Sequence, residues 1–303
     1  MRLVRIGTRG STLALAQSNW VREQFLRYHR EIEVELRVIK TSGDRFIDTA
    51  IPDIGGKGVF TKEIEEALLS KEIDFAVHSM KDLPTELPNG LAIVAVPKRE
   101  DARDVLVTRS KCRLGELPAS ARVGTGSLRR RAQLLHHRAD LNLAPIRGNI
   151  DTRLRKLDGG EVDALVMAAA GLKRIGREER IGEYLSDEVC VSAVAQGALA
   201  IEARDDAAIR DLLAFLHDAD AATEVSAERA LLGRLGGGCH VPIGARARIA
   251  GDQLKMIAVV ANPDGRGLCR GEVAGAAREA GQLGRRLAEQ LLQQGADKFL
   301  ASA

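Results

Sequence analysis

The chain has 303 residues, of which 45% are hydrophobic and 29% charged, as in an ordinary globular protein of two or three domains. It has no apolar run near the roughly 20 residues that cross a bilayer, and it opens on a strand pattern, so we expect no signal peptide and no membrane partner. A net charge of +3 and an aromatic content of 3% count against a nucleic-acid-binding surface.

Four cysteines are scattered along the chain, at positions 112, 190, 239 and 269, and no two of them form a Cys-x-x-Cys pair. This usage is typical of reduced thiols and indicates neither a disulfide framework nor a zinc site. We therefore expect a cytoplasmic protein without a bound metal.

The first part of the chain, residues 1–98, reads as an α/β unit. Apolar or alternating stretches predict strands at 3–7, 32–39, 73–77 and 91–96, and amphipathic stretches predict helices at 12–28 and 61–70. Ser11 is the expected N-cap of the first helix. A polar loop with several glycines covers 41–58, and another polar loop, 78–84, ends at Pro84.

A second set of elements begins near Asp101 and repeats details of the first. The pattern predicts strands at 105–108, 122–124, 141–146 and 162–167, a helix from Leu128, and a short helix that Asp151 caps. Residues 6–8, Ile-Gly-Thr, match 123–125, Val-Gly-Thr, and residues 72–74, Glu-Ile-Asp, match 161–163, Glu-Val-Asp. We interpret the two sets as similar lobes with mostly parallel sheets, although unrelated α/β units could show this much likeness by chance.

The remaining chain predicts a return to the first lobe and then a third domain. Residues 189–202 read as a strand followed by helix and could cross back to the first lobe, and 209–216 read as a helix. Beyond Asp220 the pattern predicts helices at 221–235 and 275–294 around strands at 243–249, 254–260 and 267–273. The predicted fold class is α/β, with lobes at 1–98 plus 195–218 and at 99–194, and a small α+β domain at 219–303.

A run of three glycines, Gly236 to Gly238, ends the helix of the third domain and is followed at once by Cys239. Glycine has no side chain and tolerates positive φ, so a ligand could approach this backbone closely. The thiol is either presented at the tip of the loop or packed as a small apolar residue in a tight turn, and the loop alone does not decide. A hydrolytic pair of Cys239 with His240 is not expected, because adjacent side chains rarely face each other.

Basic residues recur on loops and helix starts at one end of each lobe: Arg9, Lys57, Lys81, Arg129, Arg130, Arg147, Arg153 and Arg174. Because a guanidinium pairs with a carboxylate or phosphate through two parallel hydrogen bonds, the set predicts a ligand with several acid groups in the cleft between two lobes. Helix N-termini at Ser11 and Ser127 would add unpaired N–H groups. Each basic residue taken alone is explained equally well as an ordinary surface residue.

Asp82 is the acidic residue most suited to chemistry. It follows an apolar strand, and ligands of α/β proteins bind where such strands end. A carboxylate among cations can act as an acid, as a base, or as a stabiliser of a developing positive charge. The simpler interpretation is a salt bridge with Lys81.

Eight motifs, in order along nearly the whole chain, resemble those of the porphobilinogen deaminase family. They are GTRGSTLALAQ at 7–17, GGKGVF at 55–60, VHSMKDLP at 77–84, GTGSLRR at 124–130, RGN at 147–149, AAGLKR at 169–174, QGA at 196–198 and GGCHVPIG at 237–244. Together they are far more specific than any one of them. Gly10 departs from the family pattern, which favours a longer polar residue there, and Gly126 replaces a common serine.

The resemblance implies a fold whose first two domains are like a type II periplasmic binding protein. It implies a transferase, hydroxymethylbilane synthase, that carries a dipyrromethane cofactor on Cys239 through a thioether. Four porphobilinogen units are added to this primer, each with loss of ammonia, and the linear tetrapyrrole is released by hydrolysis in porphyrin and heme biosynthesis. Porphobilinogen is the small-molecule substrate, and we expect a monomer.

The same resemblance assigns roles to individual residues. Asp82 would be catalytic, stabilising the cation left when ammonia departs. The cofactor would be bound by Lys81, Asp82, Ser127, Arg129, Arg130, Arg147 and Gly148. The substrate would be bound by Arg9, Ser11, Lys57, Arg153 and Arg174.

The rival hypothesis is a non-catalytic two-lobed binder of anionic metabolites. It explains the two lobes and the arginines. It gives no role to Cys239 or to the third domain.

Overall fold

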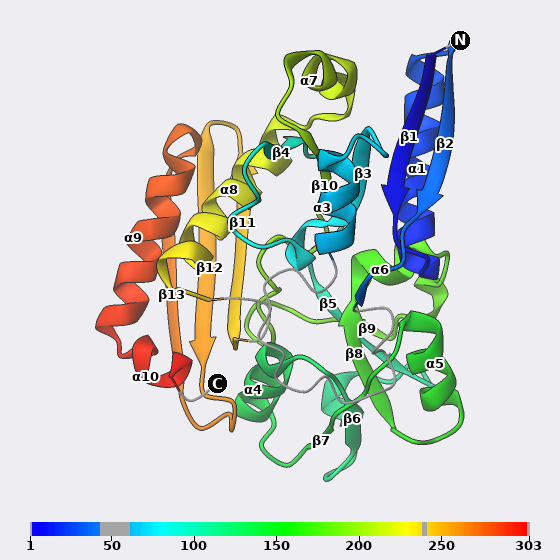
Figure 1. Ribbon diagram of the computed structural model, residues 1–303. Coiled ribbons are helices and arrows are strands. Elements are labelled where there is room, and N and C mark those ends of the chain that lie inside the picture. Colours follow the sequence, from blue (N-terminus) through cyan, green and yellow to red (C-terminus); the bar gives the residue numbers. More distant parts are fainter. Residues whose placement is uncertain (1, 43–60, 238–240, 302–303) are drawn as a thin grey trace. The chain divides into compact units, whose positions relative to one another are not determined.

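The computed structural model describes residues 2–42, 61–237 and 241–301 (Figure 1). The chain divides into two compact units, residues 1–99 with 198–222 and residues 100–197 with 223–303. Within the described residues, no helix is both long enough and apolar enough to cross a membrane.

The first unit is built on a five-stranded sheet in the order β2-β1-β3-β10-β4. Its strands are β1 (Arg2–Thr8), β2 (Ile32–Val38), β3 (Phe75–Ser79), β4 (Leu91–Ala95) and β10 (Leu199–Arg204). β10 runs antiparallel to both of its neighbours, so it is the one reversed strand of this sheet. The helices are α1 (Thr12–Tyr28), α3 (Lys62–Leu69) and α7 (Ala207–Leu213), with single 3-10 turns η1 (Met80–Asp82) and η4 (Ala214–Leu216).

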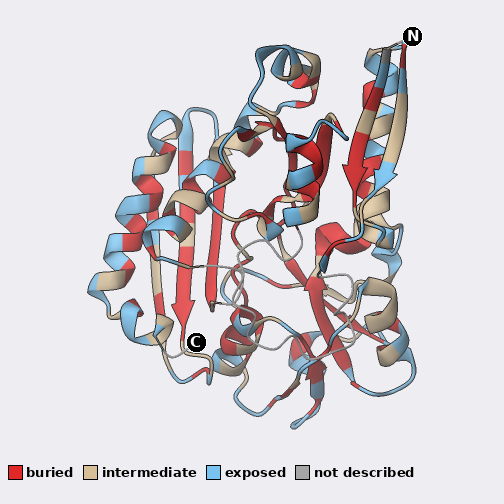
Figure 2. Cartoon of the chain, viewed as in Figure 1, coloured by how far each residue is buried: buried red, intermediate tan, exposed pale blue. Residues whose placement is uncertain are grey.

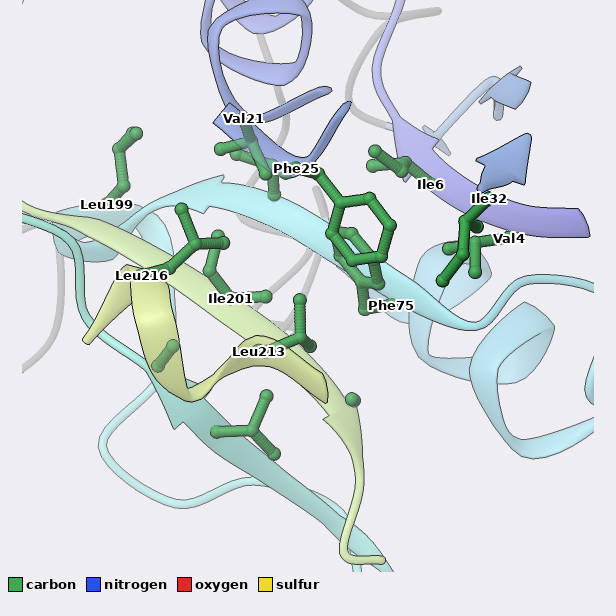
Figure 3. Close-up of a cluster of buried hydrophobic side chains, with 14 residues drawn as sticks. Val4, Ile6, Val21, Phe25, Ile32, Phe75, Leu199, Ile201, Leu213 and Leu216 are labelled. Atoms are coloured by element: carbon green, nitrogen blue, oxygen red, sulfur yellow. The ribbon is translucent and has the colours of Figure 1, made fainter. Parts of the chain in front are cut away.

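The two faces of this sheet carry different apolar clusters because side chains alternate along each strand. On one face, Phe25 of α1 and Phe75 of β3 pack with Ile201 of β10 and Leu213 of α7 (Figure 3). On the other face, Ala76 of β3 packs with a cluster that includes Ile64, Leu68, Ile73 and Leu91. Burial on both faces fixes the register of β3 and β10.

The second unit contains a five-stranded sheet in the order β7-β6-β8-β5-β9. Its strands are β5 (Asp104–Thr108), β6 (Arg122–Gly124), β7 (Asn142–Ala144), β8 (Ala164–Ala168) and β9 (Glu183–Tyr184). Here β5 is the one reversed strand. The helices are α4 (Leu128–His137), α5 (Ile150–Asp158) and α6 (Ala169–Arg174), with 3-10 turns η2 (Leu114–Glu116) and η3 (Glu178–Arg180).

The rest of the second unit is a three-stranded antiparallel sheet, β11-β12-β13, with helices. Its elements are α8 (Ala219–Arg234), whose first four residues belong to the first unit, β11 (Ile243–Ala250), β12 (Gln253–Ala261), β13 (Leu268–Ala276), η5 (Ala277–Glu279), α9 (Ala280–Gln293) and α10 (Ala296–Leu300). α9 covers β12 and β13 with its buried side, and its outer side is exposed (Figure 2). The expected fold class is confirmed: two α/β sheets and a small α+β part.

The similarity between the two five-stranded sheets extends to single hydrogen bonds. Both sheets place the reversed strand fourth in the order. Asp74 accepts a hydrogen bond from the N–H of Arg5 (2.7 Å), and Asp163 accepts one from the N–H of Arg122 (2.8 Å). The repeat that the sequence indicated is therefore a repeat of structure.

Each reversed strand also supplies an equivalent arginine. Nη1 of Arg204, in β10, donates to the carbonyls of Leu68 (2.5 Å) and Ile73 (2.9 Å). Nη1 of Arg109, just after β5, donates to the carbonyls of Leu157 (2.7 Å) and Val162 (3.3 Å). In both cases the guanidinium satisfies carbonyls at the end of a helix and in the loop that follows it.

Several predictions need correction. Asn149, and not Asp151, is the N-cap of α5, because its side chain accepts a hydrogen bond from the N–H of Thr152 (2.9 Å). Residues 199–204 form strand β10 where helix was expected, since their pairing with β3 and β4 outweighs the helical propensity of alanine and leucine. The short elements β9, α6 and α10 were not predicted.

Removing the arginine of the first reversed strand should destabilise the protein. Arg204→Met keeps most of the side-chain volume but leaves two carbonyls without a charged donor, so we expect unfolding to become easier by about 1.5–3 kcal/mol. Urea unfolding measures the loss. Arg37→Met, on an exposed stretch of β2, is the control and should change stability by less than about 0.5 kcal/mol. Equal stability of the Arg204→Met protein and the unmodified protein would contradict the role of Arg204.

Candidate active site

In the first unit, the predicted site residues follow two neighbouring parallel strands. Arg9 and Ser11 come after β1, and Lys81 and Asp82 come after β3. Because β1 and β3 run in the same direction, these residues lie at the same edge of the sheet. Asp82 is exposed at the end of η1. Ser11 caps α1 by accepting a hydrogen bond from the N–H of Ala14 (3.2 Å).

In the second unit, the predicted residues follow the equivalent strands, β6, β7 and β8. Ser127 caps α4, and its side chain accepts from the N–H of Arg130. Arg147 is exposed in the turn before α5. Gly148 adopts a φ of 106°, where any larger residue would be strained and where an added Cβ would lie 2.7 Å from Thr152.

Two further arginines contact backbone carbonyls of this unit. Nε of Arg153 donates to the carbonyl of Gly148 (2.8 Å), and Nη2 of Arg174 donates to the carbonyl of Gly197 (2.6 Å). Burial lowers the pKa of both guanidinium groups, to about 10, and the positive charge of Arg130 adds to the effect at Arg153. Both groups therefore lie where a negatively charged ligand would be favoured.

A buried carboxylate, Asp104, organises the start of α4. Arg129 and Arg130 are only 4% and 6% exposed, and Asp104 is fully buried. Oδ2 of Asp104 accepts from Nη1 of Arg129 (2.7 Å), and Oδ1 accepts from Nη2 (2.7 Å) and Nε (3.0 Å) of Arg130. Burial alone would raise the pKa of Asp104, but the two guanidinium groups outweigh it and hold that pKa well below its usual range.

The same carboxylate reaches the segment before β10. Nε2 of Gln196 donates to Oδ1 of Asp104 (2.8 Å) and to the carbonyl of Ala102 (2.7 Å). The thiol of Cys190 lies 3.3 Å from Oδ2 of Asp104. Burial, and then the charge of Asp104, raise the pKa of this thiol to about 12, so Cys190 stays protonated and is a poor nucleophile.

The structure thus groups the predicted residues within each unit but leaves two of them undescribed. Cys239 and Lys57 lie outside the described residues. Sequence reasoning missed Asp104, Gln196 and Cys190. Asp104 stands directly before an apolar strand, as Asp82 stands after one, but nothing in the sequence says that it pairs with Arg129 and Arg130 instead of with solvent.

Taken together, the described residues define an α/β protein whose two five-stranded sheets each have a basic edge. Both five-stranded sheets present helix N-termini and cationic side chains at the carboxyl ends of parallel strands. Such an edge can bind a ligand with several carboxylates. The described residues contain no group of three or more acidic, histidine or cysteine side chains that could hold a metal ion.

Comparison with known proteins identifies the family. The family model "Porphobilinogen deaminase, dipyromethane cofactor binding domain" matches residues 4–211, and "Porphobilinogen deaminase, C-terminal domain" matches residues 222–293. This chain is 49% identical to the porphobilinogen deaminase of Pelobacter propionicus, 50% identical to that of Syntrophotalea carbinolica and 52% identical to that of Desulforudis audaxviator. Each of these alignments covers 99% of this chain, and 96%, 95% and 97% of the three relatives, respectively.

This chain therefore belongs to the porphobilinogen deaminase family. It is a transferase of tetrapyrrole biosynthesis, hydroxymethylbilane synthase, with a dipyrromethane cofactor and porphobilinogen as substrate. The comparisons do not favour the rival of a non-catalytic binder. Among solved structures, an arginine-specific periplasmic binding protein from Salmonella typhimurium aligns with a TM-score of 0.41 at 16% identity, covering 73% of this chain and 96% of that one, which is too weak a likeness to support an argument.

Removing the buried carboxylate of Asp104 should lower the free energy of unfolding of the second unit. Asp104→Ala leaves two buried guanidinium groups without their counter-charge, so we expect a loss of about 3–5 kcal/mol in urea unfolding at neutral pH. Because the folded-state pKa of Asp104 lies below its unfolded value, its contribution is complete at neutral pH and is lost only as the pH falls through the folded value. The variant and the unmodified protein should thus converge in stability in strong acid.

The matched control is Asp140→Ala. Asp140 also pairs with an arginine, Arg138 at 2.6 Å, but it is exposed, so little change is expected. Similar losses from the two alanine variants would show that burial of the Asp104 cluster does not matter.

Proposed function

We propose that Cys239 carries the dipyrromethane cofactor through a thioether and that Asp82 assists the addition of each porphobilinogen unit. The support for Cys239 is the matched motif at 237–244 together with the cofactor named for the family. The other cysteines are less suited: Cys190 and Cys269 are buried, and half-buried Cys112 follows no run of glycines.

The role of Asp82 is supported by its exposure and by its position in the fold. It is an exposed carboxylate in the turn that directly follows β3, at the same sheet edge as the N-terminus of α1. A carboxylate held there can accept a hydrogen bond from a pyrrole N–H of the substrate. It would then stabilise the positive charge that develops on that pyrrole when ammonia leaves.

We propose that the cationic residues bind the acid side chains of the pyrroles. When bound, the cofactor supplies the pyrrole carbon to which a new unit is joined. Arg153 and Arg174 suit this role best, because burial lowers the pKa of both guanidinium groups and a bound carboxylate would offset that effect. Arg129 and Arg130 already form ion pairs with Asp104, so each would interact with Asp104 and with a ligand at the same time.

The remaining assignments complete the same proposal. Arg9, Ser11 and Lys57 would bind substrate, and Lys81, Ser127, Arg147 and Gly148 would bind cofactor. We also propose three domains, at 1–98 with 195–218, 99–194 and 219–303, in a cytoplasmic monomer that binds no nucleic acid. The unpaired cysteines among the described residues support a reducing compartment, and gel filtration tests the monomer.

Asp82→Asn tests the catalytic role. The amide keeps the shape of the side chain but removes its negative charge, so we expect turnover to fall about 10²–10⁴-fold while the cofactor stays attached. Turnover is followed as porphobilinogen consumption, and the cofactor as added mass on the intact protein. Glu86→Gln, a nearby exposed change, should be neutral. Normal turnover of Asp82→Asn would remove Asp82 from the chemistry.

Cys239→Ala tests the attachment point. Without the thiol no thioether can form, so the variant should have the mass of its sequence alone and no synthase activity. Mass spectrometry of the intact protein makes the comparison, and Cys112→Ala should keep the adduct. An adduct that persists on Cys239→Ala would move the attachment to another residue.

A further inference from the structure

A buried polar cluster in the first unit has no part in the site described above. Three buried polar side-chain atoms of His78 and Glu202 make no well-aligned hydrogen bond in the described part of the chain, and Glu65, which interacts with Thr61, lies near them. His78 is 6% exposed and Glu202 fully buried. Burying polar atoms without partners is costly, so this concentration in one place needs a physical explanation.

The three titratable groups come from three elements that meet on one face of the sheet. His78 lies in β3 two residues after Ala76, so both side chains point to the face that α3 covers. Glu202 of β10 pairs with Ala76 in register and points to the same face. Glu65 lies in the first turn of α3. The cluster therefore lies at the end of the apolar layer between α3 and the sheet.

His78 and Glu202 are the closest pair of this cluster. Nε2 of His78 lies 3.0 Å from Oε2 of Glu202. Glu65 lies near enough that burial, and then the charge of Glu202, raise its pKa. The titratable groups that the packed elements bring together here are thus His78 of β3, Glu202 of β10, and Glu65 and Glu66 of α3.

The cluster adjoins the turn that carries Asp82. His78 is the next-to-last residue of β3, and η1 follows at once. The start of the turn is held by the N–H of Met80, which donates to the carbonyl of Ala198 (3.0 Å). Nε2 of Gln17, from α1, lies 2.9 Å from the Ser79 hydroxyl. On the face of β3 that α3 covers, the side chain of His78 makes its contact with Glu202 of β10.

We propose that His78 is a positioning residue for Asp82, anchored by the buried side chain of Glu202, with the half-buried Glu65 beside them. This inference rests on the proposed role of Asp82. A buried polar pair usually adds little net stability compared with apolar side chains of the same shape, whereas it does restrict which arrangement of the elements is allowed. His78 thus fixes the end of β3 against β10 and α3, and so fixes where the Asp82 carboxylate stands.

The test is a double-mutant cycle between His78 and Asp82. His78→Leu should retain the cofactor mass and KM but lower kcat by about tenfold to a hundredfold, the effect of a small misplacement of a reacting group. In the Asp82→Asn background, His78→Leu should cost nothing more, because the group that it positions is already lost. His78→Gln, which keeps a nitrogen near the position of Nε2, should recover most of the rate. His137→Leu, at an exposed position, is the control.

The outcomes separate this inference from the proposed function. If His78→Leu lowers kcat equally in both backgrounds, it acts through the fold, and the positioning role is wrong. Normal kcat for His78→Leu overturns the role as well. Near-normal turnover of Asp82→Asn instead overturns the proposed function. Should His78→Leu fail to fold, Glu202→Gln is measured with and without Asp82→Asn instead. An equal loss of kcat in both backgrounds would again show that the positioning role is wrong.

Discussion

The buried carboxylate of Asp104 is the constraint on which the second unit depends. One side chain compensates two guanidinium groups and accepts from Gln196, so it joins β5, the start of α4 and the segment that leads to β10. Removing such a charge from water is costly, and only a complete set of donors offsets the cost. The donors are complete here, and this fixes the direction of Arg129 and Arg130 at the N-terminus of α4.

A second constraint is the common plan of the two five-stranded sheets. In each, four strands run in one direction and one is reversed, and an arginine in or just after the reversed strand donates to carbonyls at the end of a helix and in the loop that follows it. The plan places helix N-termini and cations together without any help from long loops. The chemistry is not symmetric, however, since the first unit carries the exposed Asp82 and the second carries the buried Asp104.

Much of this organisation could be predicted from the sequence. The helix at 12–28, the strand at 122–124 and the caps Ser11 and Ser127 follow from local pattern, and the structure has them at the predicted residues. What escaped prediction depends on contacts far apart in the chain. Residues 199–204 become a strand because β3 and β4 flank them, and Asp104 finds partners 25, 26 and 92 residues away. The positions of Asp82 in its turn and of His78 near the end of β3 likewise required the sheet.

The place of β10 in the first sheet has a consequence for how the protein is made. β10 lies between β3 and β4, yet about a hundred residues separate it from β4 in the chain. During synthesis β4 has no strand to pair with until residue 204 has left the ribosome, whereas all five strands of the second sheet come from the uninterrupted stretch 104–184. Pairings between distant segments form slowly, so we expect the second five-stranded sheet to form first, while the first sheet keeps the edge of β3 unpaired until β10 has been made. Nascent chains that stall before β10 are therefore the form most exposed to aggregation.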